Sequence, residues 1–185
     1  GGEPGAMWLD GGSDEGEDTP SGVSSVVADA REVAVRAVAR GHRFNRDLAY
    51  FEAERAEHNE LAWQRRVTHV LRFLFGPAEP RATHAHVFAH TNPLAPGAST
   101  GAVLQLAFED GRRLTALPSL GQVRSDVLAT ATVTDGLVRA LTPGTVTLTG
   151  EYGGVRGSLR LVVRTDPRAL VERIFELRAP DDTPA

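Results

Sequence analysis

Two kinds of hydrophobic spacing divide the chain. Between residues 23 and 40, apolar side chains recur every three or four positions, which predicts a helix with one buried face. Ser21 or Ser24 can cap the start of this helix, and Gly41 suits its end. The apolar positions are Val23, Val26, Val27, Ala30, Val33, Ala34, Ala37 and Val38.

A second, longer helix is predicted over residues 45–75, with Asn45 as its cap and Gly76-Pro77 as its end. Residues 52–60 interrupt it, because Ala is their only apolar residue type. Such a stretch must be solvated, paired with another charged surface, or broken. Residues 23–75 are therefore expected to form an antiparallel helical hairpin. The stripe of the second helix comprises Phe44, Leu48, Phe51, Leu61, Trp63, Val67, Val70, Leu71 and Leu74.

After a Gly- and Pro-containing linker at residues 76–82, apolar and polar residues alternate in short runs. This alternation predicts an antiparallel β domain over residues 83–166. Asp110-Gly111 and Asp135-Gly136 are hairpin turn signals, and Pro143-Gly144 marks another turn. The expected strands are 83–90, 102–109, 113–117, 120–124, 127–133, 137–141, 144–152 and 156–165.

The chain ends in a short predicted helix. Asp166 is a favoured N-cap and Pro167 a favoured first helical residue, so we expect a helix over residues 167–178 and a polar tail over 179–185. Leu170, Val171, Ile174 and Phe175 form the apolar face of this helix.

The run ATVTDGLVRALTPGTVTLT at residues 131–149 resembles the bacterial immunoglobulin-like group 2 family. That family carries Ala-Thr-Val, then Gly-x-Val-x-Ala, then Pro-Gly-x-x-x-Ile-x-Ala; here Leu148 takes the Ile place and Gly150 the final small position. Leu104, Leu106, Ala107 and Asp110-Gly111 are similar to its early strand and turn. Val123-Arg124-Ser125 stands where the family usually has a Trp before a Ser-rich stretch. The resemblance covers about residues 84–165.

The resemblance implies an Ig-like sandwich of the kind found in bacterial adhesins, surface-layer proteins and phage virion proteins, and it implies no catalysis. The expected fold class is therefore α+β: an N-terminal helical hairpin, an Ig-like antiparallel β-sandwich and a short C-terminal helix.

Charge is distributed unevenly. The net charge is −4, but residues 1–22 contain six acids and no Arg, so the rest of the chain sums to +2. This balance argues against a nucleic-acid partner held by bulk charge. The acidic, Gly-rich segment 1–22 cannot bury enough surface alone. We therefore expect Met7, Trp8 and Leu9 to anchor it to a neighbouring protein.

Candidate chemistry is sparse. All 20 basic residues are Arg, and the absence of Cys excludes a thiolate zinc site and a thiol nucleophile. No apolar run reaches the ~20 residues of a membrane span. His84, His86 and His90 would share one face of a strand and are the only candidates for a metal site. A polar strand face, or a linker that lies against the helices, is the preferred interpretation, so no metal and no cofactor is expected.

The sequence predicts a non-enzymatic structural or assembly protein. Its partners would be other protein subunits, including copies of itself, in a virion or similar particle. Alternatives are a bacterial cell-surface or surface-layer module and a metal-binding module or enzyme that uses the three histidines. Arg65 and Arg66 could pair with an acidic surface, such as the segment 1–22 of another copy, although a solvated helix face is the simpler reading. The expected partner-binding residues are Met7, Trp8, Leu9, Arg65, Arg66, Leu170, Ile174 and Phe175.

Overall fold

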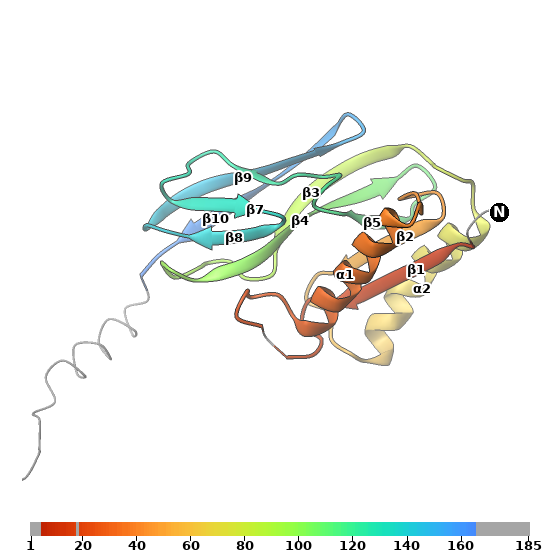
Figure 1. The fold of residues 1–185 in the computed structure, drawn as a ribbon, viewed down its shortest axis with the longest axis horizontal. Coiled ribbons are helices and arrows are strands. Elements are labelled where there is room, and N and C mark those ends of the chain that lie inside the picture. Colours follow the sequence, from red (N-terminus) through yellow and green to blue (C-terminus); the bar gives the residue numbers. More distant parts are fainter. Residues whose placement is uncertain (1–4, 18, 166–185) are drawn as a thin grey trace, which may run out of the picture.

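The computed structural model describes residues 5–17 and 19–165. Two helices and ten strands follow one another along these residues (Figure 1). They are β1 (Met7–Gly12), α1 (Ser25–Ala39), β2 (Leu48–Ala53), α2 (Glu60–Phe75), β3 (Ala82–Ala89), β4 (Ser99–Phe108), β5 (Arg113–Ala116), β6 (Arg124–Ser125), β7 (Ala131–Thr134), β8 (Leu137–Ala140), β9 (Gly144–Tyr152) and β10 (Val155–Val163). Neither described helix has the length and hydrophobicity to cross a bilayer.

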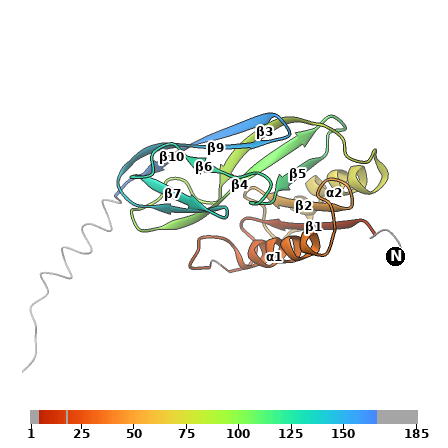
Figure 2. The ribbon, with the colours of Figure 1, turned by 45° about the horizontal axis from the view of Figure 1, so that its top comes forward.

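The N-terminal part is a β-α-β unit. Strands β1 and β2 pair in parallel, in a register that runs from Met7 opposite Leu48 to Gly12 opposite Ala53. Parallel neighbours need a crossover connection, and α1 supplies it. Ser24 caps α1 by accepting a hydrogen bond from the Val27 amide, as one of the two predicted caps. Figure 2 shows α1 on the outer side of the β1–β2 pair, with α2 and the antiparallel sheets on the other side.

The predicted helix over residues 45–75 is wrong, and the helical hairpin with it. Its first part is strand β2, in which every residue is buried. A strand that is covered on both faces reads as a continuous apolar run, which a helix pattern can imitate. Asn45 does not cap a helix; it is buried, has a φ of 66° and donates from Nδ2 to the Pro80 carbonyl.

The chain breaks within the polar stretch that the sequence analysis singled out. Helix α2 begins at Glu60, where the Asn59 side chain accepts a hydrogen bond from the Ala62 amide at 2.9 Å. The fold is therefore mostly β, with a β-α-β unit and one further helix in place of the hairpin.

The second half forms two antiparallel sheets. One has the order β3-β4-β8-β7, with β5 added beside β4, and the other has the order β10-β9-β6. Strand β4 joins different neighbours along its length, since Ser99–Gly101 pairs with β8 and Leu104–Ala107 with β5. The Asp135-Gly136 turn between β7 and β8 has φ angles of 49° and 76°, as a two-residue hairpin requires.

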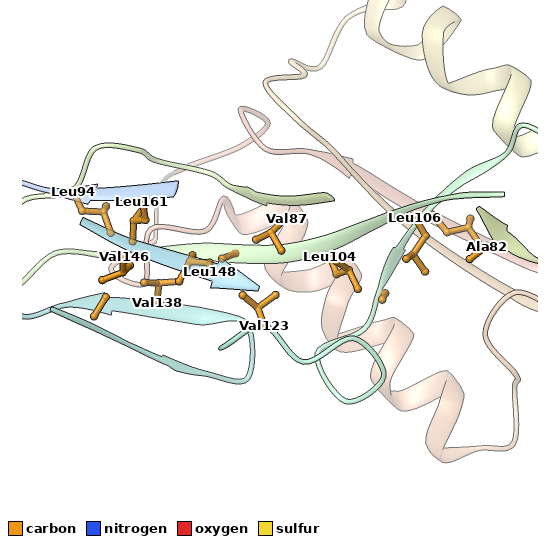
Figure 3. Close-up of a cluster of buried hydrophobic side chains, with 14 of the residues drawn as sticks. Ala82, Val87, Leu94, Leu104, Leu106, Val123, Val138, Val146, Leu148 and Leu161 are labelled. Atoms are coloured by element: carbon orange, nitrogen blue, oxygen red, sulfur yellow. The ribbon is translucent and has the colours of Figure 1, made fainter. Parts of the chain in front are cut away.

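Side chains from both sheets meet in one hydrophobic cluster (Figure 3). Leu104 on β4, Leu148 on β9 and Leu161 on β10 are fully buried there. The strands expected near 83–90, 102–109, 137–141 and 144–152 are confirmed within a few residues. The same cluster includes Phe73 of α2, so the helix packs on the sheets as well as on β1.

Candidate protein-interaction surface

Helix α2 exposes its large apolar residues and buries polar ones. Ala62, Arg66 and Phe73 are its buried residues, although Arg66 is charged. Six of the twelve exposed large hydrophobic residues of the described chain lie on this one helix. They are Leu61 (57% exposed), Trp63 (49%), Val67 (47%), Leu71 (50%), Leu74 (43%) and Phe75 (82%).

Five of these residues share one side of the helix. Positions 63, 67, 71 and 74 are spaced by four, four and three residues, which aligns them along the axis. With Phe75 they span about 120° of the helix circumference, the width of an ordinary core-facing stripe. We call Trp63, Val67, Leu71, Leu74 and Phe75 the α2 apolar face. A contiguous patch of this kind is typical of a protein-protein contact.

The opposite side of α2 is fixed to the molecule by specific contacts. Phe73 packs against Trp8 at a ring-centroid distance of 6.0 Å, and the Arg112 guanidinium lies 5.6 Å from its centroid. The Arg66 guanidinium pairs with Glu15 at 2.8 Å, and both side chains are about 95% buried or more. These contacts hold the α2 apolar face toward solvent.

Met7, Trp8 and Leu9 lie in strand β1 and are held by the chain's own β2. Met7 and Leu9 pack on the α1 side, with Leu48 and Tyr50, whereas Trp8 faces α2 and Phe73. The expected anchor for the acidic segment is therefore internal. No neighbouring protein is needed to hold it.

The two candidate arginines have different positions. Arg66 does not lie on a solvated helix face, which was the simpler interpretation; it pairs with acidic residues of its own chain, Glu15 at 2.8 Å and Asp10 at 3.5 Å. It is 3% exposed and is not available to a partner. Arg65 is exposed and lines a cavity between α2 and the sheet. Leu170, Ile174 and Phe175 lie outside the described residues.

The three candidate histidines do not converge. His84 and His86 line a shallow hollow on strand β3. His90 stacks on Phe88 at 5.3 Å and its Nε2 lies 2.8 Å from the Glu52 carboxylate. Among the described residues no three His, Asp or Glu side chains are grouped so as to hold a metal ion.

The Glu52 carboxylate, which sequence reasoning did not single out, is the centre of a buried polar cluster. It has no exposed surface. Its Oε1 accepts hydrogen bonds from Arg31 Nη2 at 2.7 Å and from the Tyr50 hydroxyl at 2.6 Å, while Oε2 lies against His90. The backbone of Glu52 is held by Thr115 Oγ1 and by the Gln105 amide.

Charge pairing dominates the titration of this cluster. Burial alone would raise the pKa of Glu52, but the Arg31 charge and the His90 hydrogen bond more than offset it, so the pKa lies below its usual value. Burial and the adjacent Glu52 charge raise the pKa of Tyr50 well above 10.0. The tyrosine is therefore a neutral donor to the carboxylate at every moderate pH. The cluster joins α1 and β2 to β4, β5 and the residue after β3, and it is largely buried, with 14% of the Arg31 side chain exposed.

Comparisons with known proteins give only distant likenesses. No protein-family model and no curated protein matches the sequence. Similar solved structures include the S-layer protein rSbsC(31-844), at 16% identity and a TM-score of 0.39, covering 47% of this chain and 15% of that one. They also include the S-layer protein SbsC domains 4 and 5, at 21% identity and a TM-score of 0.37, covering 47% and 54%.

A third similar structure is the surface layer protein SbsC, domains 1-6, at 20% identity and a TM-score of 0.38, covering 49% of this chain and 14% of that one. The chain thus covers less than two thirds of the length of each of these proteins. Likenesses at these identities and TM-scores establish no function.

Proposed function

We propose that this chain is a non-enzymatic structural protein that assembles with further copies of itself through the α2 apolar face. The observation that carries the proposal is the orientation of α2. Its apolar side lies in water while its charged Arg66 is buried. In an assembly of several copies, a neighbouring copy would cover these apolar side chains and remove them from water, which is favourable.

The occupant of the α2 apolar face is residues 167–178 of a second copy. The sequence of this segment predicts an amphipathic helix with Leu170, Val171, Ile174 and Phe175 on one side. A helix of this kind matches an exposed helical face in length and chemistry. The segment follows the last described strand, β10, which ends at Val163.

The position of β10 favours a segment 167–178 that comes from a second copy over the segment of the same copy. Strand β10 ends at the opposite end of the molecule from α2 (Figure 1). Only Arg164–Ala169 separate that strand from Leu170, and six residues span at most ~20 Å. The contact is therefore proposed between molecules. Because one surface meets a different one, such a contact is heterologous and extends into chains or rings.

The test uses two double variants of the full chain. The face variant carries Val67→Gln and Leu71→Gln, and the tail variant carries Ile174→Gln and Phe175→Gln. A control carries Leu128→Gln, since Leu128 is 65% exposed and lies in the turn before β7, outside the α2 apolar face. Analytical ultracentrifugation at concentrations up to ~100 µM suits a contact smaller than a standard interface.

The expected result is concentration-dependent association of the unchanged chain and the control, and monomers for each double variant alone. Mixed together, the two variants should form a one-to-one dimer, because one supplies an intact face and the other an intact tail. If the tail variant still self-associates, another occupant covers α2. A monomeric unchanged chain at all concentrations refutes the proposal.

For the second half of the chain we propose an Ig-like module similar to bacterial group 2 domains. The residues of the resembling run form the β7–β8 hairpin and strand β9, with the Asp135-Gly136 turn between the first two. The setting proposed for the assembly is a bacterial cell surface or surface layer. Labelled antibody on intact source cells tests it: binding at the envelope supports it, and binding only to released particles refutes it.

A further inference from the structure

A cavity of about 440 Å³ lies where the N-terminal unit, α2 and the antiparallel sheet meet. Its volume falls within the range of small-molecule sites. One wall is α2, one is the turn after β2, and the floor comes from β3, β4 and β5. We call it the junction pocket. Its lining comprises Phe51, Ala53, Glu54, Arg55, Ala56, Glu57, Asn59, Leu61, Ala62, Arg65, Arg66, His69, His86, Gln105 and Arg113.

The strand register builds the floor of the junction pocket. His86 lies opposite Gln105, and Gln105 lies opposite Thr115. Arg113 is two residues before Thr115, so its side chain shares the same face of the sheet. Thr115 and Gln105 both bond to the backbone of Glu52, which shows that this face is turned toward β2.

Positive groups in the junction pocket exceed negative ones. Among the residues that the structure describes, Arg65 and Arg113 form no ion pair, whereas Arg66 is neutralised by Glu15. Glu54 and Glu57, from the turn after β2, are the lining acids. Arg55, Arg65 and Arg113 thus stand against these two acids, and the lining keeps an excess of one positive charge.

Two histidines of the lining, His69 on the α2 wall and His86 on the floor, lie within the influence of the Arg113 charge. Burial lowers the pKa of His69, and the charges of Arg113 and Arg72 lower it further, against a partial offset from the Gly111 carbonyl and Asp110. Burial also lowers the pKa of His86, where the Glu54 charge opposes the effect and the Arg113 charge adds to it. His69 Nδ1 is buried without a hydrogen-bond partner among the described residues. Both imidazoles are therefore shifted toward the neutral form, and the Arg113 charge contributes to that shift in each case.

We propose that the junction pocket binds a small molecule through an oxyanion group, a carboxylate or a phosphate, centred on Arg113. The planar guanidinium of Arg113 supplies paired donors that match two oxygens of such a group. His69 from the α2 wall and His86 from the floor are the further donors, and Arg65 from α2 adds a second positive charge to the lining. Phe51 and Leu61 provide apolar surface for the rest of the molecule.

Binding should be linked to proton uptake. An anion beside His69 and His86 reverses the effect of Arg113 and raises both pKa values. The affinity therefore increases as pH falls toward the unshifted histidine value of 6.5. The groups that face these rings are Glu54, Arg55 and Glu57 from the turn after β2, Arg65, Arg66 and Arg72 from α2, and Asp110 and Arg113 around the start of β5.

The test is an NMR titration of the histidine ring signals in the full chain at pH 7.5 and pH 6.0. The probes are inorganic phosphate and citrate, each compared with sodium chloride at equal ionic strength. The signals of His69 and His86 should shift with saturation, more tightly at pH 6.0, while those of His42, which does not line the junction pocket, do not saturate. Tighter binding of citrate indicates a carboxylate ligand, and tighter binding of phosphate indicates a phosphate ester.

Arg113→Gln should weaken binding by roughly tenfold or more, because it removes a charge-assisted pair. Arg113→Lys should recover part of the loss, since it restores the charge without the fork. Arg139→Gln is the matched control; Arg139 is an exposed arginine on β8, outside the junction pocket. Equal affinity in Arg113→Gln and Arg139→Gln, or shifts that chloride reproduces, would overturn the proposal. Unchanged ring signals of His90 in Arg113→Gln would verify that the variant is folded.

Discussion

Removal of the Glu52 charge is the sharpest perturbation that the fold offers. Glu52→Gln keeps the shape of the side chain and replaces one carboxylate oxygen by an amide nitrogen. Arg31, with 14% of its side chain exposed, then loses its counter-ion. His90, with 4% exposed, faces an amide in place of a carboxylate. The variant therefore leaves an uncompensated charge in a closed site.

The expected cost is about 3–5 kcal/mol of unfolding free energy, the value for removing one partner of a buried ion pair. Two observations place this site in that class. The carboxylate has no exposed surface, and it accepts hydrogen bonds from three side chains: two from Arg31 and one each from Tyr50 and His90. A change of the His90 tautomer would not compensate for the lost carboxylate. It would move the ring proton to Nδ1, which is buried without a hydrogen-bond partner among the described residues.

Urea denaturation followed by tryptophan fluorescence measures the loss, since Trp8 packs on Phe51 in the strand that carries Glu52. Glu32→Gln is the matched control. It breaks the exposed Glu32–Arg36 pair on α1, whose side chains are 60% and 67% exposed, and should cost less than ~0.5 kcal/mol. If Glu52→Gln costs as little as Glu32→Gln, the cluster does not stabilise the fold and the reasoning fails.

The double variant Arg31→Met, Glu52→Gln separates charge from packing. With both charges removed, no unpaired ion remains buried, so the double variant should lose less than the sum of the two single losses. Additive losses would mean that the two groups act independently, contrary to the 2.7 Å contact between them.

Two other predictions concern the pH dependence of stability and the buried ion pair between Arg66 and Glu15. Stability in urea should decrease as the pH falls below ~6.5, because the lowered pKa values of His69 and His86 let the unfolded chain bind more protons than the folded one. It should decrease again below 4.5, as the pH falls toward the lowered pKa of Glu52. Constant stability from pH 7.5 to 4 would contradict these assignments. Arg66→Gln should cost about 3 kcal/mol because it leaves Glu15 buried, whereas the exposed neighbour Arg65→Gln should cost less than ~0.5 kcal/mol in the same measurement.

The second half of the chain could be predicted because its signals are local. Alternation has a period of two, and a turn such as Asp135-Gly136 requires positive φ angles that few residue types adopt. Strands β8 and β9 accordingly appear where the pattern placed them. Two expected strands depart from the pattern. Of 120–124 only Arg124 lies in a strand, the two-residue β6, and the strand expected over 127–133 begins only at Ala131.

The first half was mispredicted because its decisive contacts are distant in the sequence. Leu48 and Phe51 are three residues apart, which suits one face of a helix, but in β2 they lie on opposite faces and are both covered. The sequence left open whether the stretch that begins at Glu52 is solvated, paired or broken, since the partners of Glu52, Arg31 and His90, are 21 and 38 residues away. No local pattern carries that information.

The apolar stripe of α2 was found in the sequence, but its location in the fold was not. A hairpin would have buried it against the first helix. Instead, Phe73 and Arg66 occupy the inner side of the helix, and the partners of both come from the N-terminal segment, Trp8 and Glu15. The N-terminal segment, which was expected to bind a neighbouring protein, therefore holds α2 with its apolar face toward solvent.

The size of the α2 apolar face favours an array over an isolated dimer. A patch of roughly 400 Å² that becomes buried gives a gross gain of about 10 kcal/mol. Association costs at least ~4 kcal/mol and often more, so one such contact is weak. In a head-to-tail assembly each copy would supply one face and one tail, and a subunit inside the array is held by two contacts at once. The same contact would therefore give weak pairs in dilute solution and firmly held subunits within a large assembly.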